Sequence, residues 1–244
     1  QQRIRATMTS MTSALAVDIA GDKQLTRQLL ESAGLPVPPG RIEGGRILFD
    51  GEDIVTAPES RMRQIRGGKI GMIFQDPLTS LNPLYRIGDQ IVETIRTHMN
   101  LSETAARKRA IDLLAEVGIP APEKRIDAYP HEFSGGMRQR VVIALAICAE
   151  PELIIADEPT TALDVSVQAQ VIALLKSLAR EKGTAMMLVT HDMGVIAETS
   201  DRVAVMYSGR IAEIGPVQDV VQNPLHPYAK GLMGAIPTLA GEDK

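Results

Sequence analysis

The 244-residue chain has little of what would place it in several classes of protein. It contains one cysteine, Cys148, which excludes an internal disulfide and a multi-cysteine metal site. No apolar run approaches the roughly 20 residues that a membrane-spanning helix needs, so we expect any role at a membrane to be peripheral. Its 26 basic and 30 acidic residues give a formal net charge of -4 without a basic tract, which does not favour nucleic acid as a partner.

The rest of the composition is that of an ordinary folded protein. Apolar residues make up 44% of the chain and charged residues 23%, which excludes wholesale disorder. The length suits one large α/β domain or two small ones. Cys148 lies in the apolar run Val141–Ala149, so we expect a buried, unreactive thiol, and a reducing cytoplasm fits a chain with one cysteine.

Short apolar segments alternate with helical patterns along the chain. The strands that the sequence predicts are Arg46–Phe49, Asp53–Val55, Lys69–Phe74, Leu153–Ala156, Ala185–Val189, Arg202–Tyr207 and Arg210–Ile214. The helices that it predicts are Lys23–Ala33, a segment between Ser102 and Gly118, a segment from Ser134 to about Ala149, and a segment from about Val167 that ends at Gly183. This order predicts an α/β fold with a mostly parallel sheet and a small antiparallel hairpin, so ligands are expected at the carboxyl ends of the strands.

Two acidic residues follow the predicted strand Leu153–Ala156 directly. Asp157 and Glu158 would therefore lie at the carboxyl edge of the sheet, where a hard cation and a nucleotide bind. In that position Asp157 would hold Mg²⁺, directly or through water, and Glu158 would polarise an attacking water. The alternative is an ordinary loop start, which is the commoner reason for an acid pair after an apolar strand.

A hydroxyl and two glycines open the helix that begins near residue 134. Ser134, Gly135 and Gly136 leave backbone N–H groups exposed at the positive end of the helix dipole, which suits a terminal phosphate. An ordinary serine-capped helix is the alternative.

Five motifs resemble those of ABC transporter ATPases, and they occur along the chain in the family's order. Segment Phe133–Arg140 resembles the signature sequence, and Leu153–Glu158 resembles the Walker B motif. Gln75 stands in a segment similar to the Q-loop, Asp164 ends one similar to the D-loop, and His191 resembles the switch histidine. The resemblance implies that Gln75 contacts Mg²⁺ and the attacking water, that Asp164 helps to bind nucleotide where the D-loop crosses to the partner domain, and that His191 bonds the γ-phosphate.

Two further segments resemble the dipeptide and oligopeptide importer ATPases, a group that includes glutathione and nickel importers. These are Asp76–Pro83 and Asn223–Tyr228, and the likeness covers about residues 40–244. It implies an ABC-type nucleotide-binding domain with a helical signature subdomain, ATP and Mg²⁺ as cofactors, and a second nucleotide-binding subunit and membrane permease subunits as partners. It also implies a cytoplasmic subunit, peripheral on the inner face of the cell membrane.

One element of that family is missing from the sequence. The phosphate-cradling loop, Gly-x-x-x-x-Gly-Lys-Ser/Thr, occurs nowhere in the 244 residues, and the fold is therefore predicted to be incomplete. Gly67-Gly68-Lys69 has neither the earlier glycine nor the hydroxyl that the loop requires. In the family this loop precedes the hairpin, where this chain has its first forty residues.

Those first residues have a likeness of their own. Segments Thr12–Lys23 and Leu29–Pro38 resemble the start of the ATP-grasp region of cyanophycin synthetase. The alternative is a plain amphipathic helix with a proline-rich exit. The likeness predicts a chimera, joined near Pro38–Arg41, with a segment 1–40, an ABC core 41–222 whose helical subdomain is about 76–150, and a C-terminal segment 223–244.

Three functions remain open from the sequence. The first is the ATP-binding subunit of an ABC importer for peptides, with hydrolysis impaired because the phosphate loop is absent. The second is a fragment of an ATP-grasp amide ligase, which would need a later pair of Mg²⁺-binding residues that the sequence does not provide. The third is a non-catalytic module that docks on a permease or a partner ATPase.

Overall fold

The structure is a computed structural model that describes residues 14–18, 45–161 and 163–235. The predicted helix Lys23–Ala33 lies outside these residues. The predicted division of the chain at residues 40 and 222 stays a prediction.

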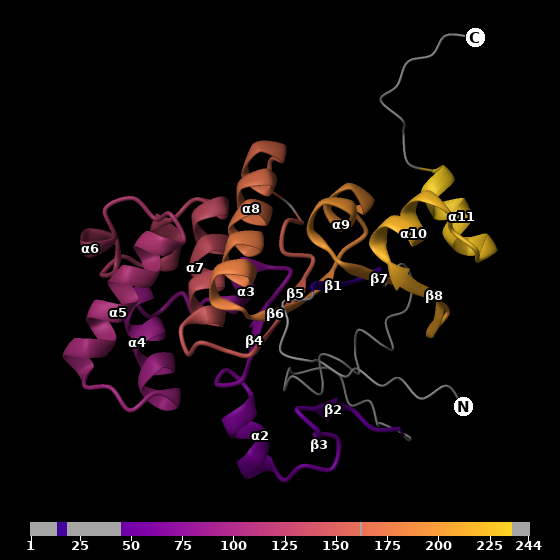
Figure 1. The fold of residues 1–244 in the computed structure, drawn as a ribbon. Helices are drawn as coiled ribbons and strands as arrows, with labels where there is room; N and C mark the ends of the chain where they lie inside the picture. The colour runs from indigo at the N-terminus through magenta and orange to yellow at the C-terminus, as the bar shows by residue number, and fades with distance from the viewer. Residues whose placement is uncertain (1–13, 19–44, 162, 236–244) are drawn as a thin grey trace.

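One six-stranded sheet forms the centre of the molecule (Figure 1). Its strands, in spatial order, are β4 Ile70–Ile73, β5 Leu153–Asp157, β6 Ala185–Val189, β1 Ala14–Asp18, β7 Arg202–Tyr207 and β8 Arg210–Pro216. The first five run parallel, and β8 is antiparallel to β7. The predicted α/β class with a mostly parallel sheet is confirmed, and each strand that the sequence predicted here is found within one or two residues of its predicted bounds.

The strand β1 was not predicted. Ala14–Asp18 lies between β6 and β7 and pairs in parallel with both, so it joins two halves of the sheet. An apolar run of only four residues before an acid cannot be distinguished from the start of a helix by periodicity alone. These residues belong to the segment that the sequence set apart as 1–40, yet their backbone is part of the central sheet.

The predicted hairpin forms a second, two-stranded sheet. It consists of β2 Leu48–Phe49 and β3 Glu52–Asp53, which are antiparallel and shorter than predicted. Asp50 and Gly51 connect them with φ values of 50° and 79°. Two positive φ values in a two-residue connection define the turn whose twist matches that of paired strands.

Eleven helical segments surround the sheets in the described residues. They are α2 Glu59–Ile65, α3 Pro77–Ser80, α4 Ile87–His98, α5 Glu103–Glu116, α6 Pro122–Arg125, the 3₁₀ segment η1 Pro130–Glu132, α7 Gly135–Ile147, α8 Val165–Lys182, α9 Met193–Thr199, α10 Val217–Gln222 and α11 Pro227–Gly234. In the described part of the chain, no helix is both long and apolar enough to cross a bilayer.

The helices that the sequence predicted begin and end for the predicted reasons. Ser102 Oγ accepts a hydrogen bond from the Ala105 N–H at 3.3 Å and so caps α5. Gly183, in the left-handed conformation with φ 65°, ends α8. The helix α7 ends at Ile147, two residues before its predicted end, and Cys148 behind it is fully buried. Burial raises the pKa of the Cys148 thiol to about 12, which fits the predicted unreactive thiol.

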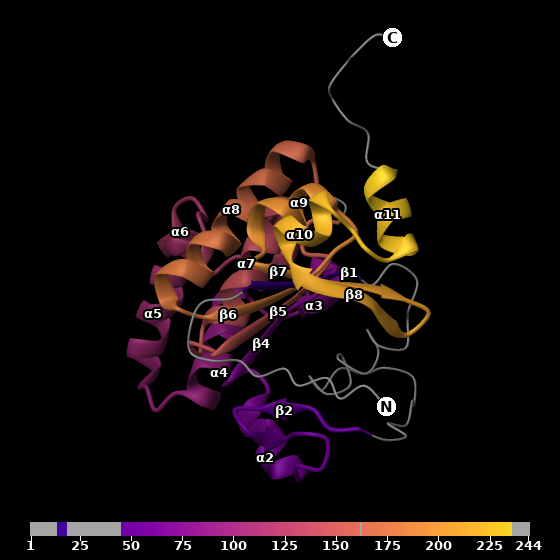
Figure 2. The same ribbon diagram turned by 45° about the vertical axis from the view of Figure 1, so that its right-hand side comes forward.

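The sheet is packed on both faces, and β5 shows how. Ile154 and Ala156 pack into the larger core, together with α7 and α8. Leu153 and Ile155, which alternate with them, pack into a smaller core with α2 and the hairpin. Figures 1 and 2 show α8, α9 and α10 on one side of the sheet and α2 with β2 and β3 on the other. The strand's carboxyl end is thereby fixed from both faces.

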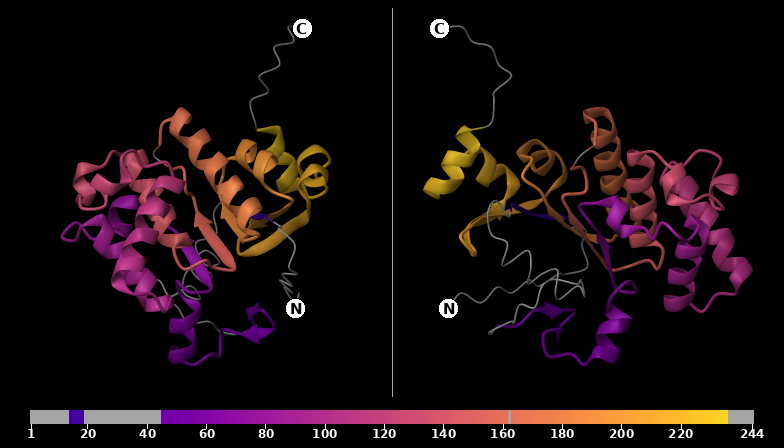
Figure 3. Two further views of the ribbon diagram at one scale, coloured as in Figure 1. Left: turned by 60° about the vertical axis from the view of Figure 1, so that its left-hand side comes forward. Right: turned by 180° about the vertical axis from the view of Figure 1, so that it is seen from behind.

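Helices α3 to α7 lie together beside the sheet (Figure 3). They occupy residues 77–147, within the predicted helical portion of about 76–150. Ile87, Ile91 and Ile95 of α4 are fully buried in the larger core, at the four-residue spacing of one helix face. This packing connects the helical portion to β4 and β5.

Candidate functional site

The two acids lie where the sequence places them, at the carboxyl edge of the sheet. Asp157 is the last residue of β5, and its backbone pairs with Val189, the last residue of β6. The Glu158 N–H donates to the Val189 carbonyl at 2.8 Å, so it is tied to the neighbouring strand. The ends of two buried strands thus set the position of both carboxylates.

Glu158 is the centre of the site, because the side chains of three other residues contact its carboxylate. Gln75 Nε2 donates to Oε2 at 2.9 Å, and Thr161 Oγ1 donates to the same oxygen at 2.8 Å. His191 Nδ1 lies 3.2 Å from Oε1. The structure therefore brings together three predicted site residues, Gln75, Glu158 and His191, that are far apart in the sequence.

The backbone of Glu158 is strained. Its φ is 42°, in the left-handed region that costs a residue other than glycine roughly 1–2 kcal/mol. Residues held in such conformations occur preferentially at functional sites, where the surrounding structure fixes them. Here the hydrogen bond to Val189 and the three side-chain contacts fix Glu158.

Asp157 differs from its neighbour in having no cation or donor beside it among the described residues. Its carboxylate makes no hydrogen bond or ion pair with the residues that the structure describes, and its side chain is half-buried. Burial, and secondly the negative charge of Glu158, raise the pKa of Asp157 above its ordinary value. A bound cation would reverse that shift.

The donor set fits Mg²⁺, which binds through one or two protein oxygens, water and phosphate. Asp157 offers a free carboxylate, and Gln75 uses its amide nitrogen on Glu158 and has its amide oxygen left as a ligand. No group of three histidine, cysteine, aspartate or glutamate side chains among the described residues could hold a metal ion alone. A Mg²⁺ here would therefore take most of its ligands from nucleotide and water.

The site is open to solvent on the side of His191. The side chain of His191 is 70% exposed and that of Glu158 is 27% exposed, so a phosphate group can approach the pair. In a neutral ring, donation from Nδ1 to Glu158 leaves Nε2 as an acceptor. Donation from His191 to a phosphate thus requires the imidazolium form or the loss of the Glu158 contact.

Two residues beside the site were missed as individual contributors. The sequence patterns do not single out Thr161, although a hydroxyl three residues after a glutamate in a turn can reach its carboxylate. Asp192 caps α9 by accepting from the N–H groups of Gly194 and Val195, and Gln168 Nε2 donates to it at 3.0 Å. The contact links α8 and α9 directly behind His191, and only the structure reveals it.

The glycine motif lies at the start of α7. Ser134 caps the helix by accepting from the Met137 N–H at 3.3 Å. A Cβ at Gly135 would meet nothing within 4 Å, whereas one at Gly136 would lie 2.7 Å from Val167 Cγ1 of α8. Gly135 is thus open to solvent, and Gly136 permits the close approach of α7 and α8.

The predicted residue Asp164 takes no part in the hydrogen bonds of the Glu158 carboxylate. It precedes α8, is exposed and makes no capping hydrogen bond with its side chain. In the described residues, no hydrogen bond or ion pair joins Asp164 or the start of α7 to Glu158. The hydrogen bonds of the described residues therefore join Gln75, Glu158 and His191, whereas Asp164 and the start of α7 are not part of that network.

Comparison with family models gives two matches. The model described as "ABC transporter" matches residues 33–161, and the model described as "Oligopeptide/dipeptide transporter, C-terminal region" matches residues 212–244. Neither includes residues 1–32. The likeness of residues 1–40 to cyanophycin synthetase has no support in these matches.

Curated relatives agree with the family models. The oligopeptide transport ATP-binding protein OppD of Bacillus subtilis is 51% identical over 96% of this chain, and the chain spans 65% of that relative's length. The dipeptide transport ATP-binding protein DppD of the same organism is 48% identical over 93% of this chain and 68% of its own length. Since the OppD alignment covers 96% of the chain, it includes most of residues 1–40.

Solved structures show the same fold. The ATP-binding cassette MJ0796, in a dimeric post-hydrolysis state bound to ADP and Pi, is 25% identical, with a TM-score of 0.72 over 85% of this chain and 86% of that chain. The structure of cbiO1 from Clostridium perfringens, part of an ABC transporter complex, is 28% identical, with the same TM-score over 87% of this chain and 80% of its own. With its sheet, its Glu158 cluster and these relatives, the chain belongs to the ABC transporter family, among the ATP-binding proteins of oligopeptide and dipeptide transporters.

Proposed function

We propose that the chain acts as the ATP-binding subunit of an ABC importer for peptides. The observation that carries the proposal is the Glu158 carboxylate at the sheet edge, contacted at once by Gln75, Thr161 and His191. A carboxylate held by three donors has a fixed orientation, which is what a residue that orients a water toward a phosphate requires. The names of the relatives supply the substrate class, peptides.

Each residue of the Glu158 cluster has a proposed part in ATP hydrolysis. Glu158 polarises the attacking water, and Gln75 holds that water and the magnesium ion. Asp157 binds Mg²⁺, whose charge neutralises the phosphate oxygens when it is bound. His191, whose exposed ring a phosphate can reach, would donate to the γ-phosphate after giving up its contact with Glu158 or in its imidazolium form.

The surface at the start of α7 serves a second nucleotide-binding subunit in this proposal. Ser134, with the N–H groups of Gly135 and Gly136, would contact an ATP held by that subunit, and Asp164 would approach it from the D-loop. Their place outside the Glu158 hydrogen bonds, and the open space at Gly135, support a role toward another chain. The further proposed partners are permease subunits, with the chain peripheral on the inner face of the cell membrane.

Hydrolysis by the isolated chain is expected to be impaired. The sequence lacks the loop whose backbone N–H groups and lysine hold the β- and γ-phosphates. Removing one donor of this kind typically costs about 10²–10³ in rate, so losing several leaves no turnover above background. The chain would then contribute mainly the surface around Ser134 to a site whose phosphate loop is on its partner.

The test is ATP-dependent association with an intact subunit, for which OppD of Bacillus subtilis serves as the probe. We expect ATP to promote a complex of the chain with OppD, measured by light scattering, and Ser134→Arg to abolish it through charge and bulk at the helix start. Ser60→Arg, an exposed serine on α2, is the matched control and should leave association unchanged. Absence of ATP-dependent association, or equal association by Ser134→Arg, would refute the proposed half-site.

A further inference from the structure

The ring of His191 is exposed, but the backbone that carries it is held from both sides. The side chain is 70% exposed, and Glu158 is its one hydrogen-bond partner among the described residues. Thr190, which precedes it, is buried, and its Oγ1 accepts from the Asp192 N–H at 3.1 Å. The imidazole can therefore turn about its side-chain bonds while the chain on either side of it is fixed.

Asp192 links this backbone to two helices. Its Oδ1 accepts from the N–H groups of Gly194 and Val195, at 2.9 and 3.1 Å, and so caps α9. Its Oδ2 accepts from Gln168 Nε2 of α8 at 3.0 Å. One carboxylate, next to His191 in the chain, is thus bonded to the start of α9 and to the start of α8.

The start of α8 has contacts on its other side as well. The Gln168 N–H donates to the Asp164 carbonyl at 2.8 Å, so both residues lie in one helical turn. Val167, in the same turn, packs over Gly136 of α7, where an added Cβ would lie 2.7 Å from Val167 Cγ1. A displacement of this turn relative to α7 therefore also moves the amide that holds the cap of α9.

A second hydrogen bond joins α8 to α9 at a distance from the histidine. Lys176 Nζ donates to the Glu198 carbonyl at 2.9 Å, near the end of α9. Figures 1 and 2 show the two helices side by side. Of these two links, only that of Gln168 bonds the residue beside His191. The effect of Gln168 on the ring can therefore be separated from its effect on the packing of α8 against α9.

The position of the ring decides how many acceptor sites Glu158 has free. Its Oε2 accepts from Gln75 and Thr161, and its Oε1 lies 3.2 Å from His191 Nδ1. Each carboxylate oxygen offers two acceptor sites, so the contact with the ring leaves one site, on Oε1. In a neutral ring this contact also requires that Nδ1 carry the proton, since a carboxylate only accepts. Turning the ring away frees a second site on Oε1 for water and frees the ring to donate elsewhere.

We propose that Gln168 is a positioning residue that holds the His191 ring against Glu158, acting through the cap of α9. The inference rests on the proposed function, in which His191 donates to the γ-phosphate and Glu158 polarises the attacking water. These two side chains engage each other in the structure, so whatever fixes the ring decides whether they are available. Because Asp164 lies in the same turn as Gln168, a subunit that binds at Asp164 would act on this link.

The test is nuclear magnetic resonance of the full chain with ¹⁵N-labelled histidine, at about pH 8.5, where a histidine of ordinary pKa is neutral. The ring nitrogen shifts give the ratio of Nδ1-protonated to Nε2-protonated His191, whose signals are assigned by their loss in His191→Gln. Gln168→Met keeps the length of the side chain and loses its donor, whereas Gln168→Lys supplies a donor again. Lys176→Met is the matched control, because it removes the other hydrogen bond from α8 to α9.

We expect the ratio to fall about two- to tenfold in Gln168→Met, the factor that corresponds to the net strength of one hydrogen bond. It should return toward the parent value in Gln168→Lys and stay unchanged in Lys176→Met. Signals of His98, His131 and His226 should be the same in all variants, which would show that the fold is intact.

An unchanged ratio in Gln168→Met, or an equal fall in Lys176→Met, would overturn the role of Gln168. The experiment uses neither nucleotide nor OppD. Failure of the proposed half-site, seen as absence of ATP-dependent association, would therefore be a separate result from failure of this inference.

Discussion

Gly71 is the residue at which one added methyl group should disturb the site most clearly through the fold. It lies in β4, two residues before the strand ends at Ile73 and four before Gln75. A Cβ built on Gly71 would lie 2.1 Å from the Ala146 carbonyl oxygen and 3.2 Å from Pro151 Cγ. Gly71→Ala must therefore push β4 away from the end of α7.

The magnitude follows from what the methyl group meets. Overpacking a core costs typically about 1–3 kcal/mol, and the upper end applies here because the obstacle is backbone rather than a side chain that can rotate. For a chain of this size, 1 kcal/mol shifts the melting temperature by about 2–4 °C, so we expect a loss of roughly 6–12 °C. Displacement of β4 should also lengthen the contact between Gln75 and Glu158.

Differential scanning calorimetry of Gly71→Ala beside Gly231→Ala measures this. Gly231 lies in α11, where a Cβ would meet nothing within 4 Å. Alanine there should stabilise the helix by about 0.5–1 kcal/mol, so its melting temperature should rise slightly. A melting temperature for Gly71→Ala within about 1 °C of the parent chain would show that the close packing of β4 on α7 is wrong.

Three further predictions concern single side chains. Asp157→Asn should raise the melting temperature at pH 7, because the pKa of Asp157 is raised in the native state and its ionised carboxylate therefore destabilises the fold above that pKa. This gain in melting temperature should shrink as the pH falls toward the pKa of an unfolded aspartate, about 3.9. A gain that is constant at all pH values would contradict this. Thr161→Val should lower the free energy of unfolding in urea by about 1 kcal/mol through loss of the donor to Glu158, while Thr161→Ser should retain it; equal losses in both variants would argue against the hydrogen bond. Cys148, buried and with a pKa of about 12, should react with a disulfide reagent at pH 8 only after unfolding, and stoichiometric labelling of the native chain would disprove its burial.

The fold was predictable wherever local signals were strong. Ser102 and Gly183 mark helix ends through capping chemistry that depends only on neighbouring residues. The strand before Asp157 is an unbroken apolar run, as expected for a strand buried on both faces. The helix α4 has a clear four-residue apolar spacing and was nevertheless not predicted, so it was missed although the signal was present.

The site was predictable in its residue types but not in its contacts. The order of motifs indicated Gln75, Glu158 and His191, yet no local pattern reports that side chains 83 and 33 residues apart meet at one carboxylate. That meeting depends on β4, β5 and β6 being adjacent in the sheet, which is a matter of tertiary pairing. The hydrogen bonds from Thr161 to Glu158 and from the Gln90 side chain to the Tyr85 carbonyl were not predicted, because side-chain hydrogen bonds of this kind leave no periodic trace in a sequence.

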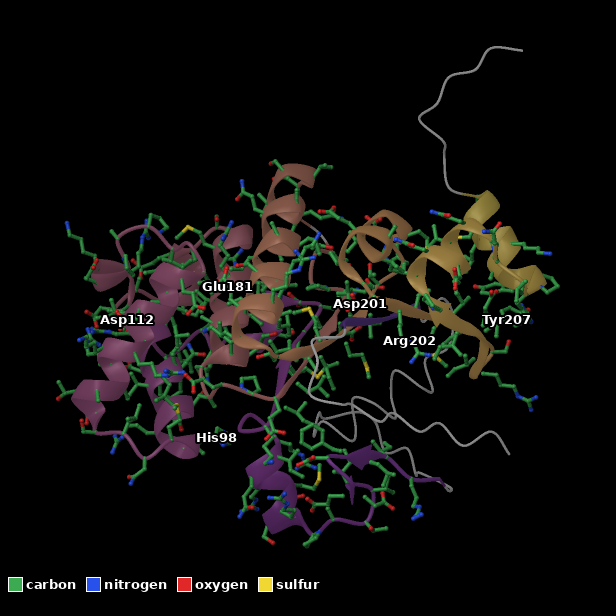
Figure 4. The ribbon with its side chains drawn as sticks, viewed as in Figure 1. His98, Asp112, Glu181, Asp201, Arg202 and Tyr207 are labelled. Carbon is green, nitrogen blue, oxygen red and sulfur yellow. The ribbon has the colours of Figure 1, made fainter. Side chains whose placement is uncertain are left out.

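On the opposite side of the molecule, too, the sequence does not predict which side chains meet. Figure 4 labels Tyr207 at the end of β7, far from His98 and Asp112 in the helical portion. Its ring packs against Tyr228 of α11 with 4.5 Å between centroids, a contact across 21 residues that neither segment predicts alone. Tertiary contacts of this kind orient α11. The sequence predicted neither this helix nor α10.

Phosphate release from Mg²⁺-ATP by the purified chain measures whether the Glu158 cluster supports turnover without a phosphate loop, with Glu158→Gln as the paired variant and a mixture with intact OppD as the second condition. We expect the chain alone to release phosphate at the background rate of Glu158→Gln, because the Glu158 cluster is present but the phosphate loop is not in the sequence. We also expect that addition of the chain raises hydrolysis by OppD in a manner that depends on Ser134. Robust Mg²⁺-dependent turnover by the chain alone, lost in Glu158→Gln, would show that the chain does not need this loop.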